Sequence, residues 1–513
     1  MEELVRQLAD KEARLKLGGG EKAIAKRHEQ GKLTARERLE LLFDPGTFTE
    51  TDLFVKHRGT ELGMTGKETP GEGVVTGFGK VDGRTVFAFS QDFTVMGGSL
   101  GEMHAQKIVK LQQMALRAGA PIIGIQDSGG ARINEHIDSL NGYGQIFMNN
   151  TMASGVIPQI SVIMGPCAGG AVYSPGLTDF IFMVDQKSYM YITGPEVIRA
   201  VTREETTHDA LGGAGAHAMK SGVAHFAAPS EEECIAQVKR LLSYLPANNV
   251  DDAPFAGETD PAGRLEQRLL EIVPENPNKP YDVREIITSV LDHGDFFEVQ
   301  AGWAQNMVVG FGRLTGRPVG IIANQAKVMA GCIDINASDK ASRFIRFCDA
   351  FNIPVVTFVD TPGYLPGVNQ EHGGIIRHGA KLLYAYCEAT VPKLVVIIRK
   401  AYGGAYLAMC AKSLGADFVV AWPGAEIAVM GADGAANILC KPGPEVEDPA
   451  AHKAQWVADY KEKFNTPFMA AARGFVEAVI DPRQTRPTLA AALAGFETKR
   501  ETRPAKKHGN FPV

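Results

Sequence analysis

Residues 160–170 read Ile-Ser-Val-Ile-Met-Gly-Pro-Cys-Ala-Gly-Gly, and residues 394–404 read Leu-Val-Val-Ile-Ile-Arg-Lys-Ala-Tyr-Gly-Gly. In both stretches, an apolar run rich in Ile and Val precedes a pair of glycines. Such a run is typical of a strand that is buried on both faces of a parallel sheet. A helical pattern follows each Gly-Gly pair, so both stretches predict a strand, a tight turn and a helix.

The two stretches belong to a longer internal repeat. Asp127 matches Asp360 at an offset of 233 positions (360 − 127), and Gly169 matches Gly403 at 234 (403 − 169). Further matches at 233 are Gly77/Gly310, Gly79/Gly312, Gly83/Gly316, Met96/Met329, Gly98/Gly331, Lys107/Lys340 and Pro121/Pro354. Self-similarity of this length predicts two homologous domains rather than a short-unit solenoid.

Within each copy, short Val- and Ile-rich runs alternate with helical patterns, as at 102–118 and 336–352. This alternation predicts the α/β class for both copies. Pro, Asn and Asp concentrate in 246–262, which is the natural linker. We therefore predict a first domain of residues 1–255, which begins with a helical arm at 1–32, and a second domain of residues 256–513.

The composition excludes several classes of function. Apolar residues make up 45% and charged residues 22%, as in ordinary soluble proteins, and a net charge of −6 gives no footprint for nucleic acid. The 7 cysteines include no CxxC pair, which is typical of a reducing compartment and predicts no bound metal. No apolar stretch approaches the about 18 residues of a membrane span, so we expect a cytoplasmic protein without membrane insertion.

The Gly-Gly turns are the strongest candidates for chemistry. A strand, a pair of small residues and a helix place backbone N–H groups at the positive end of the helix dipole. Such N–H groups make an oxyanion hole, in which one donor stabilises a transition state by about 3 kcal/mol. For one Gly-Gly pair alone, close packing of helix and strand is the simpler explanation. Because the copies agree at this turn, we look for the chemistry here.

Other glycine-rich loops and motifs indicate which protein family the chain resembles. A glycine loop precedes a helix in both copies, at Gly97-Gly98 and at Gly331, and this pattern resembles the crotonase (enoyl-CoA hydratase) superfamily. Further motifs are Ser90-Gln-Asp-Phe-Thr-Val-Met-Gly-Gly98, Asp127-Ser-Gly-Gly-Ala-Arg132, Ile333-Asp-Ile-Asn-Ala-Ser-Asp-Lys340 and Tyr364-Leu-Pro-Gly367. With them, the whole chain resembles the carboxyltransferase subunits of biotin-dependent acyl-CoA carboxylases and decarboxylases. The resemblance implies two tandem crotonase-like (ClpP/crotonase) domains related by internal duplication.

The resemblance also implies a reaction, in which a carboxyl group moves between biotin and the α carbon of a short acyl-CoA. Propionyl-CoA and methylmalonyl-CoA are the favoured pair. One hole would hold the acyl-CoA thioester and the other the ureido carbonyl of biotin, whose freed nitrogen could take the α proton. By motif position, the holes are Gly169-Gly170 and Gly404-Ala405, and which hole holds which partner stays open.

The family pattern implies further binding residues. The candidate CoA contacts are Gly97, Gly98, Ser128, Gly129, Gly130 and Gly331. Arg132 is a candidate partner for a phosphate group, with a structural role in its turn as the alternative. Leu407 occupies a position that lines the acyl pocket in the family, where propionyl-specific enzymes of one bacterial branch carry Asp. Leu407-Ala-Met-Cys410, with Asn248-Asn249 at the end of the first domain, is more similar to the methylmalonyl-CoA decarboxylase α subunit and to transcarboxylase. The direction of the reaction therefore stays open, as does acetyl-CoA as a substrate.

The resemblance implies partner proteins as well. The chain has no ATP-binding glycine loop, and Lys220 in Ala-Met-Lys-Ser is followed by Ser221 instead of the Met or Leu of a biotinyl-lysine motif. A biotin carboxyl carrier protein, a biotin carboxylase subunit or membrane decarboxylase subunits are therefore the expected partners. The family implies a hexamer, a trimer of dimers, in which the first domain of one chain faces the second domain of another.

Two other classes of function would place different requirements on the sequence. A CoA-thioester hydratase or hydrolase would need a catalytic carboxylate beside the hole of one copy only. A non-enzymatic acyl-CoA-binding scaffold would predict that one Gly-Gly turn has decayed, whereas both are intact. His372 and His378 lack the carboxylate-rich setting of a metal site, and we expect them to pack near the active cleft.

Overall fold

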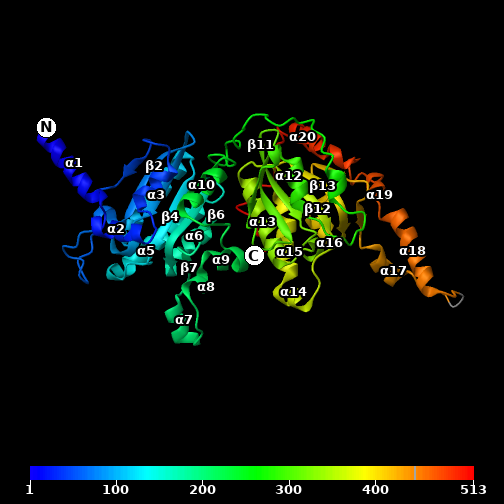
Figure 1. The fold of residues 1–513 in the computed structure, drawn as a ribbon, viewed down its shortest axis with the longest axis horizontal. Helices are drawn as coiled ribbons and strands as arrows, with labels where there is room; N and C mark the ends of the chain where they lie inside the picture. Colours follow the sequence, from blue (N-terminus) through cyan, green and yellow to red (C-terminus); the bar gives the residue numbers. More distant parts are fainter. Residues whose placement is uncertain (444–445) are drawn as a thin grey trace. The chain divides into compact units, whose positions relative to one another are not determined.

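The computed structural model describes residues 1–443 and 446–513, which divide into two compact units, Met1–Asp251 and Asp252–Val513 (Figure 1). The boundary expected from composition, between residues 255 and 256, lies just beyond this division. Each unit is built around one sheet of 8 strands with helices packed against it. The predicted α/β class is confirmed.

The first unit carries its strands in the order β1-β2-β3-β4-β5-β6-β8, with β7 paired to β5. The strands β1 to β3 pair antiparallel, and the strands from β3 onward pair parallel. Its strands are β1 (Thr49–Thr51), β2 (Val74–Val81), β3 (Arg84–Gln91), β4 (Ile122–Ser128), β5 (Gln159–Ala168), β6 (Phe180–Val184), β7 (Tyr189–Tyr191) and β8 (Phe226–Ala228). Its helices are α1 (Glu2–Lys16), α2 (Glu21–Glu29), α3 (Ala35–Leu42), α4 (Glu102–Ala118), α5 (His136–Ala153), α6 (Tyr173–Leu177), α7 (Pro195–Thr202), α8 (His208–Gly212), α9 (Ala214–Ala216) and α10 (Glu231–Leu242).

The second unit has the same topology, in the order β16-β14-β13-β12-β11-β10-β9, with β15 paired to β13. Its strands are β9 (Phe296–Val299), β10 (Met307–Leu314), β11 (Arg317–Asn324), β12 (Val355–Thr361), β13 (Lys393–Tyr402), β14 (Phe418–Ala421), β15 (Glu426–Ala428) and β16 (Ala478–Val479). Its helices are α11 (Leu269–Ile272), α12 (Val283–Val290), α13 (Ile335–Ala350), α14 (Val368–Gly373), α15 (Ile375–Glu388), α16 (Gly403–Ala408), α17 (Ala432–Leu439), α18 (Pro449–Phe464), α19 (Pro467–Ala471) and α20 (Thr485–Gly495).

The register of the two sheets preserves the sequence repeat. Phe87 of β3 pairs with Ile122 of β4, and the residues at the offset of 233, Gly320 and Val355, pair in the same way. Ile122 pairs with Gln159 of β5, while Val355 pairs with Lys393 of β13, which restores the offset of 234. The internal duplication is therefore confirmed pair by pair.

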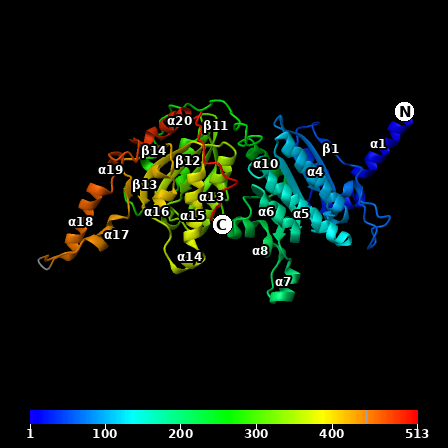
Figure 2. The same cartoon turned by 180° about the vertical axis from the view of Figure 1, so that it is seen from behind.

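The central strands are buried on both faces, as their composition predicts. Every residue of β4 and of β12 is buried. In the first unit, α4 and α5 pack on one face of the sheet through Ile108, Leu111 and Ile146, a side that is visible in Figure 2. Because parallel strands end at the same edge, the loops after β4 and β5 lie together at the carboxyl edge of the sheet.

The N-terminal helices are attached to the first unit through α2 and α3. The helix α1 has no buried residue, whereas α3 is capped by Thr34 and Glu37 in a reciprocal capping box. Arg27 of α2 and Arg38 of α3 are both buried and reach the end of β4. Over residues 1–443 and 446–513, no helix combines the length and the apolar character that crossing a membrane requires.

Candidate active site

In the first unit, the predicted turn joins β5 to a short helical segment. The strand ends at Ala168, a 3₁₀ turn covers Gly169–Val172, and α6 follows directly. Gly169 has a φ of +63°, in the left-handed region that favours glycine. Both Gly169 and Gly170 are half-buried, so their backbone is reached from the surface. As the first residues of a helical turn, they carry N–H groups that have no partner within the helix.

In the second unit, α16 starts at Gly403, immediately after β13. Gly403 has a φ of +56°, close to that of Gly169, and Gly404 is exposed. The offset of 234 aligns Gly403 with Gly169, so the predicted pair Gly404-Ala405 lies one residue further along than Gly169-Gly170. Both turns present N–H groups at the start of a helix.

A tyrosine ring lies against the second glycine of each turn. A Cβ atom at Gly170 would lie 3.6 Å from the Tyr143 ring, and one at Gly404 would lie 3.9 Å from the Tyr364 ring. Tyr143 belongs to α5, whereas Tyr364 follows β12, so the two rings come from different elements. Burial raises the pKa of Tyr364 to about 12, which keeps its hydroxyl protonated, and this hydroxyl donates to the Gly379 carbonyl at 3.3 Å.

The loop at Gly97-Gly98 packs against the end of β4. Both glycines have positive φ, and a Cβ atom at Gly98 would lie 2.2 Å from the Asp127 carbonyl oxygen. The Gly129 N–H donates to the Gly97 carbonyl at 3.0 Å. A Cβ atom at Gly331 would likewise lie 2.3 Å from the Asp360 carbonyl oxygen. The close approach of two backbones therefore requires glycine at both matched positions.

The loop Ser128-Gly129-Gly130 also lies beside the Gly-Gly turn. The Gly130 N–H donates to Ser128 Oγ at 3.1 Å, and a Cβ atom at Gly130 would lie 3.0 Å from the Ala168 carbonyl oxygen. The first unit thus brings together its predicted hole and the predicted CoA contacts at 97–98 and 128–130.

Arg132 is buried at the base of this loop. Its guanidinium pairs with Glu72 and with Glu135, at 2.7 Å from Glu135 Oε1, and donates to the Ser99 carbonyl at 3.0 Å. These contacts occupy the group that a phosphate would use. They favour the structural role for Arg132 over a phosphate contact.

Each unit has one buried aspartate near its Gly-Gly turn, and the sequence patterns did not predict which side chains pair with it. Asp127 pairs with Arg27 and with Arg38, whose Nη1 lies 2.8 Å from Oδ2. Asp360 accepts from Arg399 Nε at 3.0 Å and from the Tyr281 hydroxyl at 2.9 Å. The match of Asp127 with Asp360 was the only sequence signal for these clusters.

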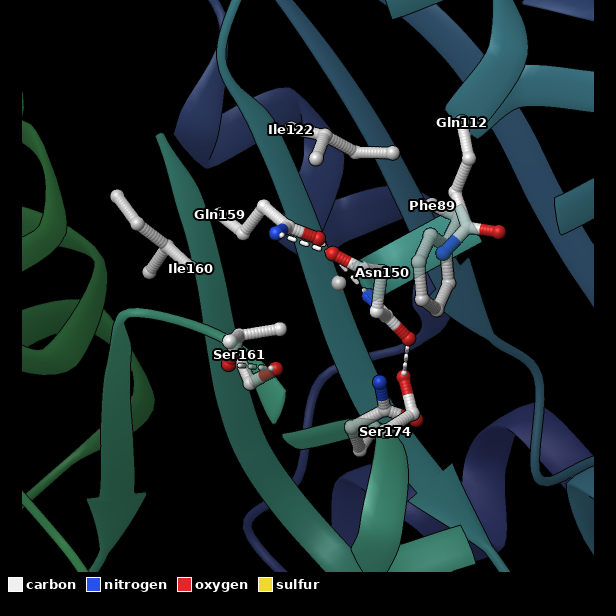
Figure 3. Close-up of a pocket in the computed structure, with 11 residues that line it drawn as sticks. Phe89, Gln112, Ile122, Asn150, Gln159, Ile160, Ser161 and Ser174 are labelled. Atoms are coloured by element: carbon white, nitrogen blue, oxygen red, sulfur yellow. Dashed lines mark hydrogen bonds between the residues drawn. The ribbon is translucent and has the colours of Figure 1, made fainter. Parts of the chain in front are cut away.

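A buried polar cluster holds α6 in place below the first turn (Figure 3). Ser174 Oγ of α6 donates to Asn150 Oδ1 at 2.9 Å, and Asn150 Nδ2 donates to Gln159 Oε1 at 3.0 Å. Gln159 Nε2 returns a bond to the Asn150 carbonyl at 2.9 Å. The matched positions of the second unit hold Lys393 and Ala408, so this cluster distinguishes the two units.

Across the described residues, no three His, Cys, Asp or Glu side chains are grouped so that they could hold a metal ion. Tyr402, which precedes Gly403, donates its hydroxyl to Glu426 of β15. His378 Nδ1 lies 2.8 Å from the Asp339 carboxylate, a single acidic partner, and His372 is exposed.

The chain matches one protein-family model, described as the carboxyl transferase domain, over residues 26–511. The methylmalonyl-CoA decarboxylase subunit alpha of Veillonella parvula is 62% identical and covers 100% of this chain and 99% of that protein. The propionyl-CoA carboxylase carboxyltransferase subunit of Haloferax mediterranei is 57% identical and covers 100% of both. Among solved structures, the transcarboxylase 12S hexamer with hydrolysed methylmalonyl-CoA bound has a TM-score of 0.98 at 56% identity, over 100% of this chain and 99% of that one.

Proposed function

The chain belongs to the carboxyl transferase family, and we propose that it moves a carboxyl group between biotin on a partner protein and the α carbon of methylmalonyl-CoA or propionyl-CoA. It is an acyl-CoA carboxyltransferase. The observation that carries the mechanism is the duplicated turn, because Gly169 and Gly403 start two matching sets of accessible N–H groups. Two sets of donors suit a reaction in which negative charge develops on the carbonyl oxygens of two substrates, the acyl-CoA thioester and biotin.

Biotin supplies the nitrogen that holds the carboxyl group and that takes the α proton when this group leaves. During carboxylation, the N–C bond to the carboxyl group breaks and a C–C bond forms at the α carbon of the thioester. In the reverse direction the same bonds change in the opposite sense. The protein then has to stabilise charge on two carbonyl oxygens, and backbone N–H groups do so without a side-chain base.

We assign these donors to Gly169-Gly170 and Gly404-Ala405. The exposed Gly404 and the half-buried Gly169-Gly170 support this assignment, since a guest must reach the backbone. Ala405 is buried, but its N–H still lies in the first turn of α16. For CoA, we propose contacts with Gly97, Gly98, Ser128, Gly129, Gly130 and Gly331. Arg132 would position this loop from below rather than touch the ligand.

The side chains beside the turns, Leu407 among them, determine which acyl chain the enzyme accepts. An apolar pocket distinguishes one methylene by only about 1–3 kcal/mol. Acetyl-CoA is therefore expected as a poorer substrate rather than an excluded one. Relatives of similar identity are named as subunits of a methylmalonyl-CoA decarboxylase, a propionyl-CoA carboxylase and a methylmalonyl-CoA carboxyltransferase. In this proposal, one half-reaction serves all three directions.

The biotin-carrying partner is a separate protein in this proposal, either a carrier protein, a biotin carboxylase subunit or membrane decarboxylase subunits. We also propose a hexamer, built as a trimer of dimers, because the transcarboxylase 12S structure of the same fold is described as a hexamer assembly. The 7 cysteines are free, which suits a reducing cytoplasm.

The test uses the purified full chain, methylmalonyl-CoA and free biotin. We expect propionyl-CoA to form only when biotin is present, because biotin must accept the carboxyl group. Release of carboxyl group at the same rate without biotin would contradict the proposal, and so would hydration of an enoyl-CoA. Heat-denatured protein is the control for spontaneous decarboxylation.

A further inference from the structure

The strands that lead into the two Gly-Gly turns differ in charge at matched positions. Lys400 of β13 pairs with Glu426 of β15. The matched residue of β5, Pro166, pairs with Tyr189 of β7. The second unit therefore carries a positive and a negative side chain where the first unit carries neither. Lys400 lies three positions before Gly403, so this difference is close to the second turn.

Lys400 shares one face of the sheet with Tyr402 and Glu426. Side chains two positions apart on a strand point to the same face, which applies to Lys400 and Tyr402. The Tyr402 hydroxyl donates to Glu426, so this carboxylate lies on that face too. Lys400 is half-buried, and among residues 1–443 and 446–513 no group forms a hydrogen bond or an ion pair with its ammonium. Because Glu426 is bonded to the tyrosine instead, the ammonium is available to an anion from outside the protein.

The Lys400 ammonium also lies near the loop that contains Gly331. Burial raises the pKa of the Cys332 thiol, and the positive charge of Lys400 opposes this rise. A charge shifts the pKa of a neighbouring group only at short range. Cys332 follows Gly331 directly, and Gly331 is one of the proposed CoA contacts. Lys400 is therefore close to both parts of the site in the second unit, the turn and the loop.

Three other positive side chains already have protein partners. Arg399, which precedes Lys400, donates to Asp360 through Nε at 3.0 Å. Arg132 pairs with two glutamates, and the buried Lys340 donates to backbone carbonyls. A half-buried ammonium without such a partner has lost water and gained no opposite charge. An anionic substrate would supply that charge.

The proposed reaction contains one anionic group, at the reacting centre, that the backbone donors do not hold. The carboxyl group of methylmalonyl-CoA is ionised at neutral pH, as carboxyl groups in water are. The backbone N–H groups of the two turns are assigned to the two carbonyl oxygens. Because the reaction moves one carboxyl group, one cation is enough, which agrees with a lysine in one unit and a proline in the other.

We infer that the Lys400 ammonium binds the carboxylate of methylmalonyl-CoA at the second turn. This inference rests on the proposed function. Lys400 keeps its proton and forms no covalent bond, so it is a binding residue for the group that is transferred. Hydrogen bonds between an ammonium and a carboxylate are roughly twice as strong as neutral ones. Propionyl-CoA has no such carboxylate, and Lys400 should therefore discriminate between the two thioesters.

The experiment measures the Kd of methylmalonyl-CoA and of propionyl-CoA by isothermal titration calorimetry with the purified full chain. Biotin is left out, so no carboxyl group is transferred to it during the titration. We expect Lys400→Met to raise the Kd of methylmalonyl-CoA by roughly 10- to 100-fold, the loss that follows removal of a charged hydrogen bond. The Kd of propionyl-CoA should stay nearly unchanged. Lys400→Arg keeps the positive charge and should bind methylmalonyl-CoA better than Lys400→Met does.

Lys412→Met is the matched control, because it removes another ammonium of the second unit, one that already pairs with Glu477. It should leave both Kd values unchanged. Lys400→Gln should repeat the selective loss, which keeps the inference testable if the methionine variant folds poorly.

Two results would overturn the inference. Equal weakening of both thioesters would mean that Lys400 contacts the CoA part that they share, and unchanged Kd values for both would mean that it contacts neither. A wild-type protein that binds methylmalonyl-CoA but transfers no carboxyl group to biotin would instead refute the proposed function, so the two failures are distinguishable.

Discussion

Gly165 of β5 and Arg399 of β13 occupy matched positions of the two sheets. The residue at this position determines which element supplies the arginine that pairs with the buried aspartate of its unit. Arg399 contacts Asp360 directly from its own strand. A Cβ atom at Gly165 would lie 1.9 Å from Asp127 Oδ1, so this position of the first unit excludes any side chain. Arg27 and Arg38 arrive from the N-terminal helices instead.

This relationship predicts that the N-terminal helices α2 and α3 are essential to the first unit. Arg38 is fully buried and bonds Asp127, Glu231 and the Met164 carbonyl. Arg38→Ala should destabilise the fold by about 3–5 kcal/mol, because it leaves the buried Glu231 carboxylate without its arginine and the buried Asp127 carboxylate with Arg27 alone. Urea unfolding measures this loss. Arg6→Ala, which removes an exposed pair with Glu3, should leave stability nearly unchanged, and equal effects of both variants would contradict the prediction.

Gly404→Pro removes one backbone donor of the second turn. Gly404 is the second residue of α16, where the helix does not need its N–H and proline is tolerated. We expect kcat to fall by about 10²–10³ while the circular dichroism spectrum stays that of the wild type. Gly424→Ala, in an open part of the second unit, is the control. Full activity of Gly404→Pro would exclude this turn as a hole.

Ser174→Ala copies the second unit, which has Ala408 at the matched position. In the first unit, this change leaves Asn150 Oδ1 without the hydroxyl that donates to it. An unsatisfied buried acceptor costs about 1–3 kcal/mol, so thermal unfolding should occur at a lower temperature. Ala408→Ser in the second unit buries a new hydroxyl and should also destabilise. A neutral result for Ser174→Ala would show that the cluster does not anchor α6.

Lys340 should make stability depend on pH. Its ammonium is buried and donates to the carbonyls of Gln300 at 2.9 Å and Trp303 at 2.8 Å, and burial lowers its pKa to about 7. Above this pH the unfolded chain binds more protons than the folded one, so stability should rise with pH by up to about 1.4 kcal/mol per unit.

The comparison with Lys340→Met isolates this effect. The difference in unfolding free energy between wild type and variant should grow in favour of the wild type from pH 7 to pH 9. Burial lowers the pKa of Lys107, the matched residue of the first unit, to about 8, so the corresponding rise should begin at higher pH. Parallel pH profiles of wild type and Lys340→Met would mean that the carbonyls keep the ammonium charged.

Glu426→Gln separates carboxyl transfer from thioester hydrolysis. Glu426 is a carboxylate near the second turn, but it accepts from the Tyr402 hydroxyl rather than facing a free position. We expect the variant to keep carboxyl transfer within about 10-fold, well short of the 10²–10⁴-fold loss that follows removal of a general base. CoA release from methylmalonyl-CoA without biotin is the second measurement. If that release is substantial in the wild type and disappears in the variant, a hydrolase function is favoured instead.

Much of the fold was predictable because its signals are local. The buried strands β5 and β13 each contain a continuous apolar run. Thr34 and Glu37, which lie within four residues of each other, mark the start of α3. The glycine turns were predictable for the same reason, since Gly169 and Gly403 need a left-handed φ that other residues rarely adopt.

The environment of the site was less predictable. Arg132 lies in a sequence motif, yet its role depends on Glu72, a residue 60 positions earlier that the motif does not include. Tyr143 and Tyr364 both line the second glycine of a turn but occupy unmatched positions of the repeat, so no alignment of the two copies reveals them.

The sequence by itself determined the duplication, the α/β class and the two glycine turns, because periodicity and turn chemistry act between residues that are neighbours along the chain. Only the tertiary structure decided which side chains neutralise and support those turns. Arg38 reaches Asp127 across 89 positions and Arg27 across 100. Such pairs are selected by burial, since a carboxylate removed from water requires a charged partner wherever the fold can bring one.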